Sequence, residues 1–213
     1  MSRPVIYVLA GVNGAGTSSI GGYLLTRAGL TWFNPDTFAR ELRKRSDCPQ
    51  EEANAQAWQE GMRRFSLAVK NGTDYAFETT LGGSTVAKLL RGACASHDVV
   101  IWFCGLASPE LHIRRVQARV RAKGHDIPEE KIRERYPNAL HNLIQLMPHI
   151  AALQVYDNST EAAPGKPIAD PILVLEMSGG ALAWPRAANR KALKETPGWA
   201  APLMEAALRV SGK

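Results

Sequence analysis

The sequence Gly11-Val12-Asn13-Gly14-Ala15-Gly16-Thr17-Ser18 joins a short apolar run at residues 5–9 to an apolar-periodic segment at residues 18–28. This order of features predicts a strand, a tight turn and a helix. The turn fits the pattern GxxxxGK[ST] at Gly11, Gly16 and Ser18, with Gly14 inside it. In that pattern the backbone N–H groups of the loop hold phosphates at the N-terminus of a helix. The spacing favours such a site over a simple glycine turn.

Thr17 stands where the pattern has a lysine. That lysine normally reaches the β- and γ-phosphates of a nucleotide, and threonine has neither the charge nor the length to do so. Three explanations are open. The protein binds nucleotide weakly or not at all, another basic residue has taken over the role, or the chain is a deliberately disabled variant of an active form.

Strands alternate with helices along most of the chain. We expect strands at residues 30–33, 75–79, 99–104, 153–156 and 172–175, with the apolar run 99–104 at the centre. We expect helices at residues 37–45, 51–70, 85–95 and 109–122. This alternation predicts an α/β fold with a mostly parallel sheet flanked by helices on both faces, a three-layer sandwich.

A single domain over residues 1–213 is expected from the length, with a helical lid at about 109–137 and a peripheral tail at about 178–213. Residues 158–170 read as a polar loop. For the tail we expect a peripheral helix with Trp184 and Trp199 as anchors. The sequence shows no secretory leader and no membrane-length apolar run, so a cytoplasmic protein without a membrane partner is expected.

The composition is that of an ordinary globular chain, with 45% hydrophobic residues and a net charge of +6. The three cysteines are too few and too scattered for a disulfide framework or a zinc site. The positive charge suits phosphorylated ligands, nucleic acid or an acidic protein partner. Nucleic acid is not favoured, because no interleaving of aromatic and basic residues and no known reader motif is present.

Acidic side chains follow two of the expected strands. Asp36 comes after residues 30–33, where a carboxylate could take the proton of a substrate hydroxyl or could cap the next helix. Glu78 lies at the end of the strand expected at 75–79, where it could bind a substrate hydroxyl or hold a magnesium-bound water. Thr80, just after the strand, could donate a hydrogen bond, and both residues could instead cap the strand end.

Arginines gather on both sides of a glycine loop. Arg115 and Arg119 lie four residues apart on one expected helix, and Gly124-His125-Asp126-Ile127-Pro128 resembles a hinge. Arg133 and Arg135 follow it. Two arginine-bearing helices around a hinge predict a lid that places guanidinium groups on transferring phosphates.

These motifs in this order resemble the zeta-toxin-like P-loop kinases, in particular their short bacterial members. The resemblance covers about residues 3–159 and rests on the glycine loop, NPDTFAR at 34–40, FETTL at 77–81, RVRAKGHDIPEEKIRERYPNAL at 119–140 and VYDNS at 155–159. It implies a P-loop kinase-like fold and an ATP- and Mg²⁺-dependent phosphotransferase. UDP-N-acetylglucosamine is the acceptor of the better-known members, and a small antitoxin protein is a partner.

The resemblance also implies site residues. Asp36 matches the general base, and Glu78 and Thr80 match the substrate-binding strand end. Ser18 matches the magnesium-binding hydroxyl, and Arg119 together with either Arg133 or Arg135 matches the phosphate-binding arginines. The nucleotide-binding residues are then Gly11, Asn13, Gly14, Ala15, Gly16, Thr17, Ser18 and Ser19, with residues 156–159 near the adenine.

Two departures from the family pattern leave alternatives open. Thr17 puts turnover by this chain in question, so a non-catalytic protein that binds a nucleotide or a partner is the second hypothesis. The short members also have less acceptor-binding machinery than the long toxins, so the sugar nucleotide does not transfer securely to this chain.

Overall fold

Six strands form one sheet in the order β2-β1-β3-β4-β5-β6 in the computed structural model, which describes residues 2–27, 29–122, 124–161, 170–186 and 189–212. The strands are β1 (Val5–Ala10), β2 (Tyr75–Thr79), β3 (Asp98–Gly105), β4 (Ala152–Asp157), β5 (Ile172–Ser178) and β6 (Ala181–Trp184). The first four pair in parallel, so the expectation of a mostly parallel sheet in an α/β fold is confirmed. The strand β3 lies inside the sheet, as its apolar sequence predicts.

The other edge of the sheet is antiparallel, which the sequence analysis missed. Asp157 at the end of β4 pairs with Ile172 at the start of β5, so the chain re-enters the sheet at the end that it has just left. The strand β6 then pairs antiparallel with β5. The polar loop that we expected at residues 158–170 falls mostly on residues 162–169, which lie outside the described part of the chain.

Residues 30–33 do not form the strand that we expected. Only Phe33 pairs with the sheet, through a single bridge to Phe77. The reason lies in the next residues, because the helix α2 (Pro35–Ser46) begins at once with Asn34 as its N-cap. A proline at the first helical position has a backbone suited to a helix start and has no N–H to continue a strand.

Helices cover both faces of the sheet. Ile6, Val8 and Ala10 of β1 belong to the main hydrophobic core, into which α4 (Ser84–Ala93) and α6 (Glu129–Leu146) pack. Leu9 faces the other way and packs with Leu25 of α1 (Thr17–Arg27). This alternation explains why the parallel strands read as nearly continuous apolar runs.

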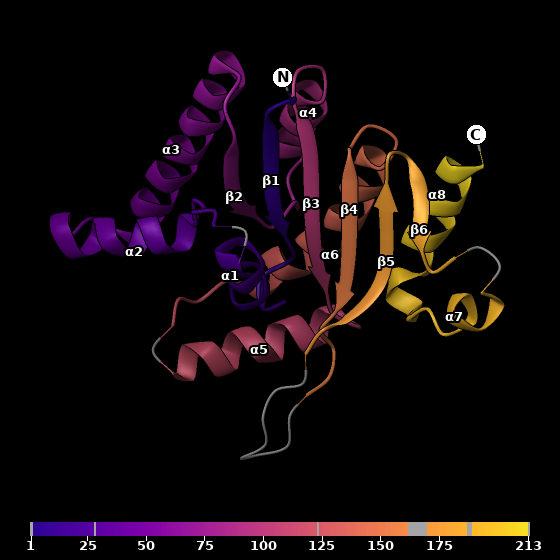
Figure 1. Ribbon diagram of the computed structural model, residues 1–213. Helices are drawn as coiled ribbons and strands as arrows, with labels where there is room; N and C mark the ends of the chain where they lie inside the picture. The colour runs from indigo at the N-terminus through magenta and orange to yellow at the C-terminus, as the bar shows by residue number, and fades with distance from the viewer. Residues whose placement is uncertain (1, 28, 123, 162–169, 187–188, 213) are drawn as a thin grey trace.

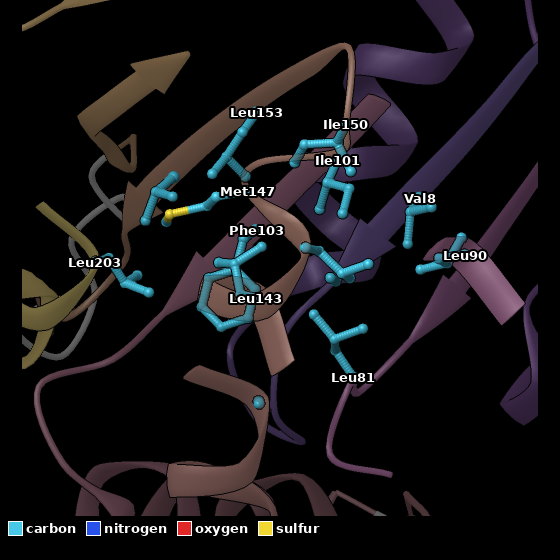
Figure 2. Packing of buried hydrophobic residues seen from close by; sticks show 14 of the residues in the cluster. Val8, Leu81, Leu90, Ile101, Phe103, Leu143, Met147, Ile150, Leu153 and Leu203 are labelled. Carbon is cyan, nitrogen blue, oxygen red and sulfur yellow. The ribbon is translucent and has the colours of Figure 1, made fainter. Parts of the chain in front are cut away.

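The C-terminal segment packs more deeply than the peripheral tail that we expected. After β6 it forms α7 (Arg190–Lys194), a short 3₁₀ turn and α8 (Ala201–Ser211). Leu203 of α8 is fully buried and belongs to the same core cluster as Phe103 and Leu143 (Figure 2). Trp199 is an anchor, as expected, because its ring packs on Gly105 and is 8% exposed. Trp184 is not, since 41% of it is exposed on β6.

The helix α6 runs past Pro137, where the sequence suggested the end of the lid. A proline inside a helix removes one backbone hydrogen bond. The buried face of α6 outweighs this loss, because Ile132, Ala139 and Leu143 are fully buried on both sides of the proline. The lid and the core therefore share one continuous helix.

The carboxyl ends of β1, β2, β3 and β4 meet at one edge of the sheet, at the bottom of Figure 1. The helix α5 (Pro109–Arg121) runs across this edge, and α2 and α3 (Gln50–Asn71) stand beside β2 as a helical pair. In open parallel sheets the crevice at this edge is the usual ligand site. Within the described residues, no helix is long and apolar enough to cross a membrane.

Candidate functional site

The glycine loop, residues 11–18, leaves β1 in a conformation that favours glycine. Gly14 and Gly16 have φ angles of +88° and +86°, in the left-handed region. A Cβ atom on Gly11 would lie 2.5 Å from the carbonyl oxygen of Cys104, and one on Gly16 would lie 2.7 Å from Nδ2 of Asn158. The three glycines are therefore required by the turn and by the close packing beneath it.

Side chains below the loop hold its carbonyl groups. The carbonyl oxygen of Ala15 accepts hydrogen bonds from Nδ2 of Asn158 at 2.8 Å and from the thiol of Cys104 at 3.1 Å. The carbonyl oxygen of Asn13 lies 2.9 Å from Nδ1 of His112. Within the described residues, no protein acceptor is found for the backbone N–H groups of Asn13, Gly14 and Gly16. These N–H groups form the kind of concave donor surface that binds anions.

His112 is a site residue that the sequence analysis missed, since the one histidine named there is His125 of the expected hinge. His112 is 1% exposed, and burial lowers its pKa to about 4, so the ring is neutral at pH 7 and donates from Nδ1 to Asn13. It stands between the buried Leu111 and Ile113 at the start of α5. The signal in the sequence was therefore a histidine inside an apolar helix face.

Thr17 is buried against the start of the loop. Its side chain is 7% exposed and lies so close to Gly11 that a Cβ atom on Gly11 would be 2.7 Å from Oγ1 of Thr17. A short, uncharged side chain in this place cannot supply the cation of the usual pattern. The cations that line the cleft come from other elements, namely Arg115, Arg119 and Arg135.

Glu78 is the centre of a hydrogen-bonded cluster beside the loop. Its carboxylate accepts from the hydroxyl of Ser18 at 2.8 Å and from Nδ2 of Asn34 at 2.6 Å. Burial raises the pKa of Glu78, and the nearby charge of Asp36 raises it further, while the bond from Ser18 acts in the opposite direction. The side chain is thus committed to the site and does not cap its own strand.

Asp36 lies in the first turn of α2 and lines the same cleft. It is not the N-cap, which was the other interpretation of this residue. The cap is Asn34, whose Oδ1 accepts from the backbone N–H of Thr37 at 2.9 Å. The exposed carboxylate of Asp36 is therefore not used to cap the helix.

Thr80 lines the cleft and also stabilises the turn after β2. Its Oγ1 accepts from the backbone N–H of Gly82 at 3.4 Å, as Oγ1 of Thr79 does from that of Leu81 at 3.1 Å. Capping of the strand end, which we considered for Glu78 and Thr80, is therefore done by Thr79 and Thr80. Thr80 can still meet a ligand, because it lines the cleft.

The structure separates the two arginine candidates on α6. Arg135 donates to Oδ1 of Asn13 at 2.8 Å and packs on Gly82, so it reaches the glycine loop. Arg133 pairs with Glu110 at 2.7 Å on the surface and does not line the cleft. Of the two alternatives, only Arg135 is placed to touch a ligand in the glycine loop.

Arg115 and Arg119 reach the cleft from α5. One nitrogen of Arg115 donates to the carbonyl oxygens of Asn158 at 2.7 Å and Thr160 at 3.1 Å, which fixes the start of the loop after β4. Arg119 donates to the carbonyl oxygen of His125 at 2.9 Å, and its buried Nε has no acceptor among the described residues. An unsatisfied buried donor at a cleft is a position that a ligand can satisfy.

These residues surround one cleft of about 1560 Å³ at the carboxyl edge of the sheet. Its basic half is formed by Arg115, Arg119, His125 and Arg135. Its apolar half is formed by Phe33, Asn54, Ala57, Trp58, Gly61 and Met62. The glycine loop, Glu78 and Asp36 lie in the same cleft.

The oxygen-rich cluster at Ser18 and Glu78 suits magnesium. Mg²⁺ is commonly held by one or two protein oxygen ligands together with substrate phosphates and water, and it does not require a dedicated protein cage. The described residues contain no group of three histidine, cysteine or acidic side chains that could form such a cage. The side chain of Ser19, which the sequence analysis added to the nucleotide site, lies outside what the structure describes.

Solved structures share this fold at low sequence identity. The structure of AvrRxo1-ORF1:-ORF2 with ATP aligns with a TM-score of 0.60 and 13% identity over 85% of this chain and 60% of that chain, so the protein spans less than two thirds of it. The PezAT chromosomal toxin-antitoxin system of Streptococcus pneumoniae aligns with a TM-score of 0.52 and 16% identity, over 74% of this chain and 68% of that one. The mixed α/β fold, with its six-stranded sheet between helices, is thus shared with these solved structures.

Sequence comparison gives the family. An uncharacterized protein of Haemophilus influenzae is 25% identical over 129 residues, which cover 59% of this chain and 88% of that protein. The family model described as zeta toxin matches residues 1–163. Because this match takes in the glycine loop, both acidic positions and the lid arginines, and most of the chain, the protein belongs to the zeta toxin family.

Proposed function

We propose that the protein is an ATP-dependent kinase that transfers the γ-phosphate to a hydroxyl group of a small acceptor. One observation carries this proposal: the glycine loop, an exposed carboxylate and several arginines face one cleft. The glycine loop, Arg135, Glu78 and Asp36 all line it, and Arg135 contacts the loop while Asp36 lies near Glu78. These are the groups that phosphoryl transfer needs, namely a phosphate cradle, a metal site and an acceptor base.

Each group has a task in the step. The N–H groups of Asn13, Gly14 and Gly16 would bind the β-phosphate. Asp36 would take the proton of the acceptor hydroxyl as its oxygen bonds to the γ-phosphorus, while the bond from that phosphorus to the bridging oxygen breaks and ADP leaves. Arg119 and Arg135 would stabilise the charge on the phosphoryl oxygens, since fixed cations in a cleft act most strongly where charge develops.

Ser18 and Glu78 would hold Mg²⁺, whose charge offsets that of the β- and γ-phosphates. The hydroxyl of Ser18 now donates to Glu78, so it must turn its lone pair toward a metal when one binds. Burial and the neighbouring Asp36 raise the pKa of Glu78, and a cation bound beside the carboxylate would lower it.

The missing lysine bears directly on this proposal. Arg135 already donates to the loop at Oδ1 of Asn13, so a guanidinium group of α6 stands close to where the lysine would reach. We therefore favour takeover of the role by another basic residue. The competing function is a non-catalytic protein that binds a nucleotide or a partner, and the buried, uncharged Thr17 is the observation in its favour.

Two further points rest on the family resemblance. UDP-N-acetylglucosamine is the first acceptor to test, because the better-known members use it. A small antitoxin that covers the cleft is the expected partner. The AvrRxo1-ORF1:-ORF2 structure contains two proteins, and the PezAT structure is that of a toxin-antitoxin system, so both support a search for such a partner.

The test is a paired measurement of ATP binding and ATP turnover by the unchanged chain and by Thr17→Lys, with Mg²⁺ and candidate acceptors present. We expect both forms to bind ATP and the lysine form to transfer phosphate faster. If neither form binds ATP, the kinase proposal is wrong. If both bind and neither transfers, the non-catalytic alternative is supported.

A further inference from the structure

Asn34 lies where the chain leaves the edge of the sheet and starts the helix that carries Asp36. The residue before it, Phe33, is fixed to β2 by two backbone hydrogen bonds. Its N–H donates to the carbonyl oxygen of Ala76 at 2.8 Å, and its carbonyl oxygen accepts from the N–H of Glu78 at 2.9 Å. The helix α2 begins directly after Asn34, and Asp36 lies in its first turn. The position of Asp36 relative to Glu78 is therefore set at this junction.

The helix α2 packs mainly on its neighbour α3, beside β2 (Figure 1). Ala39 of α2 shares a small core cluster with Ala53 and Ala57 of α3, and this cluster is separate from the main core. Phe38 also packs against the main core, with its ring centroid 5.5 Å from that of Phe33. The contacts that hold the first turn of α2 to the sheet are therefore concentrated near its N-terminus.

The side chain of Asn34 makes two kinds of contact at this junction. Its Oδ1 accepts from the backbone N–H of Thr37 at 2.9 Å and so caps α2. Its Nδ2 donates to Oε2 of Glu78 at 2.6 Å and lies 3.4 Å from Oγ of Ser18. The N–H of Thr37 can only donate, so the amide oxygen must face it and the amide nitrogen must face the carboxylate. One amide thus joins the helix of Asp36 to the side chain of Glu78.

Capping alone does not require asparagine at position 34. Serine and aspartate cap helices as well as asparagine does, and Ser108 caps α5 in this chain. Neither would replace the contact to Glu78. A serine hydroxyl is shorter and carries one donor, whereas aspartate carries none and would add a third carboxylate beside Glu78 and Asp36. The amide is therefore explained by the contact to Glu78, which it makes in addition to the cap.

We infer that Asn34 is a positioning residue of the proposed phosphoryl transfer, which holds the carboxylates of Asp36 and Glu78 in one fixed arrangement. This inference rests on the proposed kinase function, in which Asp36 takes the proton of the acceptor and Glu78 contributes to the metal site. Like charges in one cleft repel each other, and the amide joins the elements that carry them. Displacement of a catalytic group by about 1 Å can cost about a hundredfold in rate, so removal of this link should slow transfer.

A double-mutant cycle tests the contact between Asn34 and Glu78 without any need for activity. The variants are Asn34→Ser, Glu78→Gln and the two together, and urea unfolding at neutral pH gives the stability of each. Asn34→Ser keeps a capping side chain and removes the amide donor, so it should lower the urea midpoint of the unchanged chain. In the Glu78→Gln background the shift should be at most about half as large, because hydrogen bonds to charged groups contribute about twice as much as neutral ones.

Asn189→Ser is the matched control for the loss of an asparagine cap. Asn189 caps α7, where its Oδ1 accepts from the backbone N–H of Ala192 at 3.1 Å, and it does not line the cleft. This variant should shift the urea midpoint equally with and without Glu78→Gln, and it should leave phosphate transfer unchanged.

The second readout separates positioning from binding. Transfer of labelled phosphate to a hydroxylated acceptor is measured in whichever of the unchanged chain and Thr17→Lys is active, at saturating Mg²⁺. Asn34→Ser should lower kcat at least about tenfold. The affinity for ATP, measured by calorimetry without Mg²⁺, should be unchanged, because the glycine loop and the arginines of the cleft are intact.

Each result decides between the proposals. If Asn34→Ser shifts the urea midpoint equally in the two backgrounds, Asn34 only caps α2, so the inference is wrong and the kinase proposal stands. An unchanged kcat would overturn the inference in the same way, and a loss of ATP affinity equal to the loss of kcat would assign Asn34 to nucleotide binding and not to positioning. If neither the unchanged chain nor Thr17→Lys transfers phosphate, the kinase proposal fails first and the inference falls with it.

Discussion

Arg135 and Arg133 show how two residues of one helix receive different tasks. Both are arginines of α6, two positions apart, so a helix turns their side chains to different sides. One reaches Asn13 in the glycine loop, and the other pairs with Glu110 at the surface. The sequence could not choose between them, because their order along α6 does not reveal which side faces α5 and the loop.

Arg135→Gln should weaken the binding of ATP by about tenfold or more, because in the proposed complex it removes a charge-assisted contact to the phosphates. Arg133→Gln is the matched control and should bind ATP as the unchanged chain does, since exposed ion pairs contribute little to stability. Calorimetry with ATP and Mg²⁺ measures both. If the two variants bound ATP with equal affinity, Arg135 would not be a nucleotide-binding residue.

Glu78 is placed at some cost to stability. Its pKa is raised in the folded state, so the charged form is disfavoured there relative to the unfolded chain and the native state is less stable at neutral pH than it would be with a neutral group. Glu78→Gln should therefore raise the free energy of unfolding at pH 7 in denaturant titrations. The same variant should require about ten times more Mg²⁺ for ATP binding or turnover. A variant that is less stable at pH 7 would contradict this account.

His112 predicts an acid-sensitive loop. Its pKa is about 4 in the folded protein against an ordinary value of 6.5, so protons bind preferentially to the unfolded chain between these two values. The titration of His112 leaves the free energy of unfolding unchanged above pH 6.5. As the pH falls toward 4, this titration lowers the free energy of unfolding by on the order of 3 kcal/mol.

The measurement is urea unfolding at pH 7.5 and pH 4.5 for the unchanged chain and for His112→Asn. Carboxylates contribute acid sensitivity to both proteins, so the comparison isolates the histidine. The unchanged chain should lose more stability than the variant between the two pH values. Equal losses would show that His112 is not buried in its neutral form.

At the scale of elements, substitutions in α8 test whether the C-terminal segment is part of the hydrophobic core. Leu203→Ala should cost about 2–5 kcal/mol in the free energy of unfolding, because a fully buried leucine leaves a cavity. Leu208→Ala on the same helix should cost far less, since Leu208 is 37% exposed. Chemical denaturation measures both, and similar costs would mean that α8 is a peripheral helix after all.

Elements with a strong apolar period were predictable, and the exceptions have physical reasons. The strands at residues 75–79 and 99–104 and the helix at 109–122 are present nearly as expected. Residues 30–33 looked like a strand because they are apolar, yet the helix cap at Asn34 limits pairing to one residue. The direction of β5 depends on where the preceding loop returns, and this cannot be read from the apolar pattern of the strand itself.

At the scale of the whole molecule, the site could be predicted in part. The glycine loop and Glu78 follow from the rule that parallel strands bring their carboxyl ends together. Asp36 was expected on the same ground, but the residues before it form only a single bridge, at Phe33. His112 and the apolar face of α3 were not predicted as site residues, and Arg115 was expected only as a lid arginine, because their roles depend on how α5 and α3 pack against the edge of the sheet. Such packing is set by tertiary contacts, and helical periodicity alone does not determine it.

The most direct test of the central claim is transfer of labelled phosphate. The unchanged chain and Asp36→Asn are each incubated with γ-labelled ATP, Mg²⁺ and a set of hydroxylated acceptors, and phosphate monoesters are separated and counted. Loss of a general base typically lowers the rate by about 10²–10⁴. The account predicts a labelled monoester with the unchanged chain and a decrease of about a hundredfold or more with Asp36→Asn. Equal labelling by the two proteins, or no labelling even when Thr17→Lys is used in place of the unchanged chain, would contradict it.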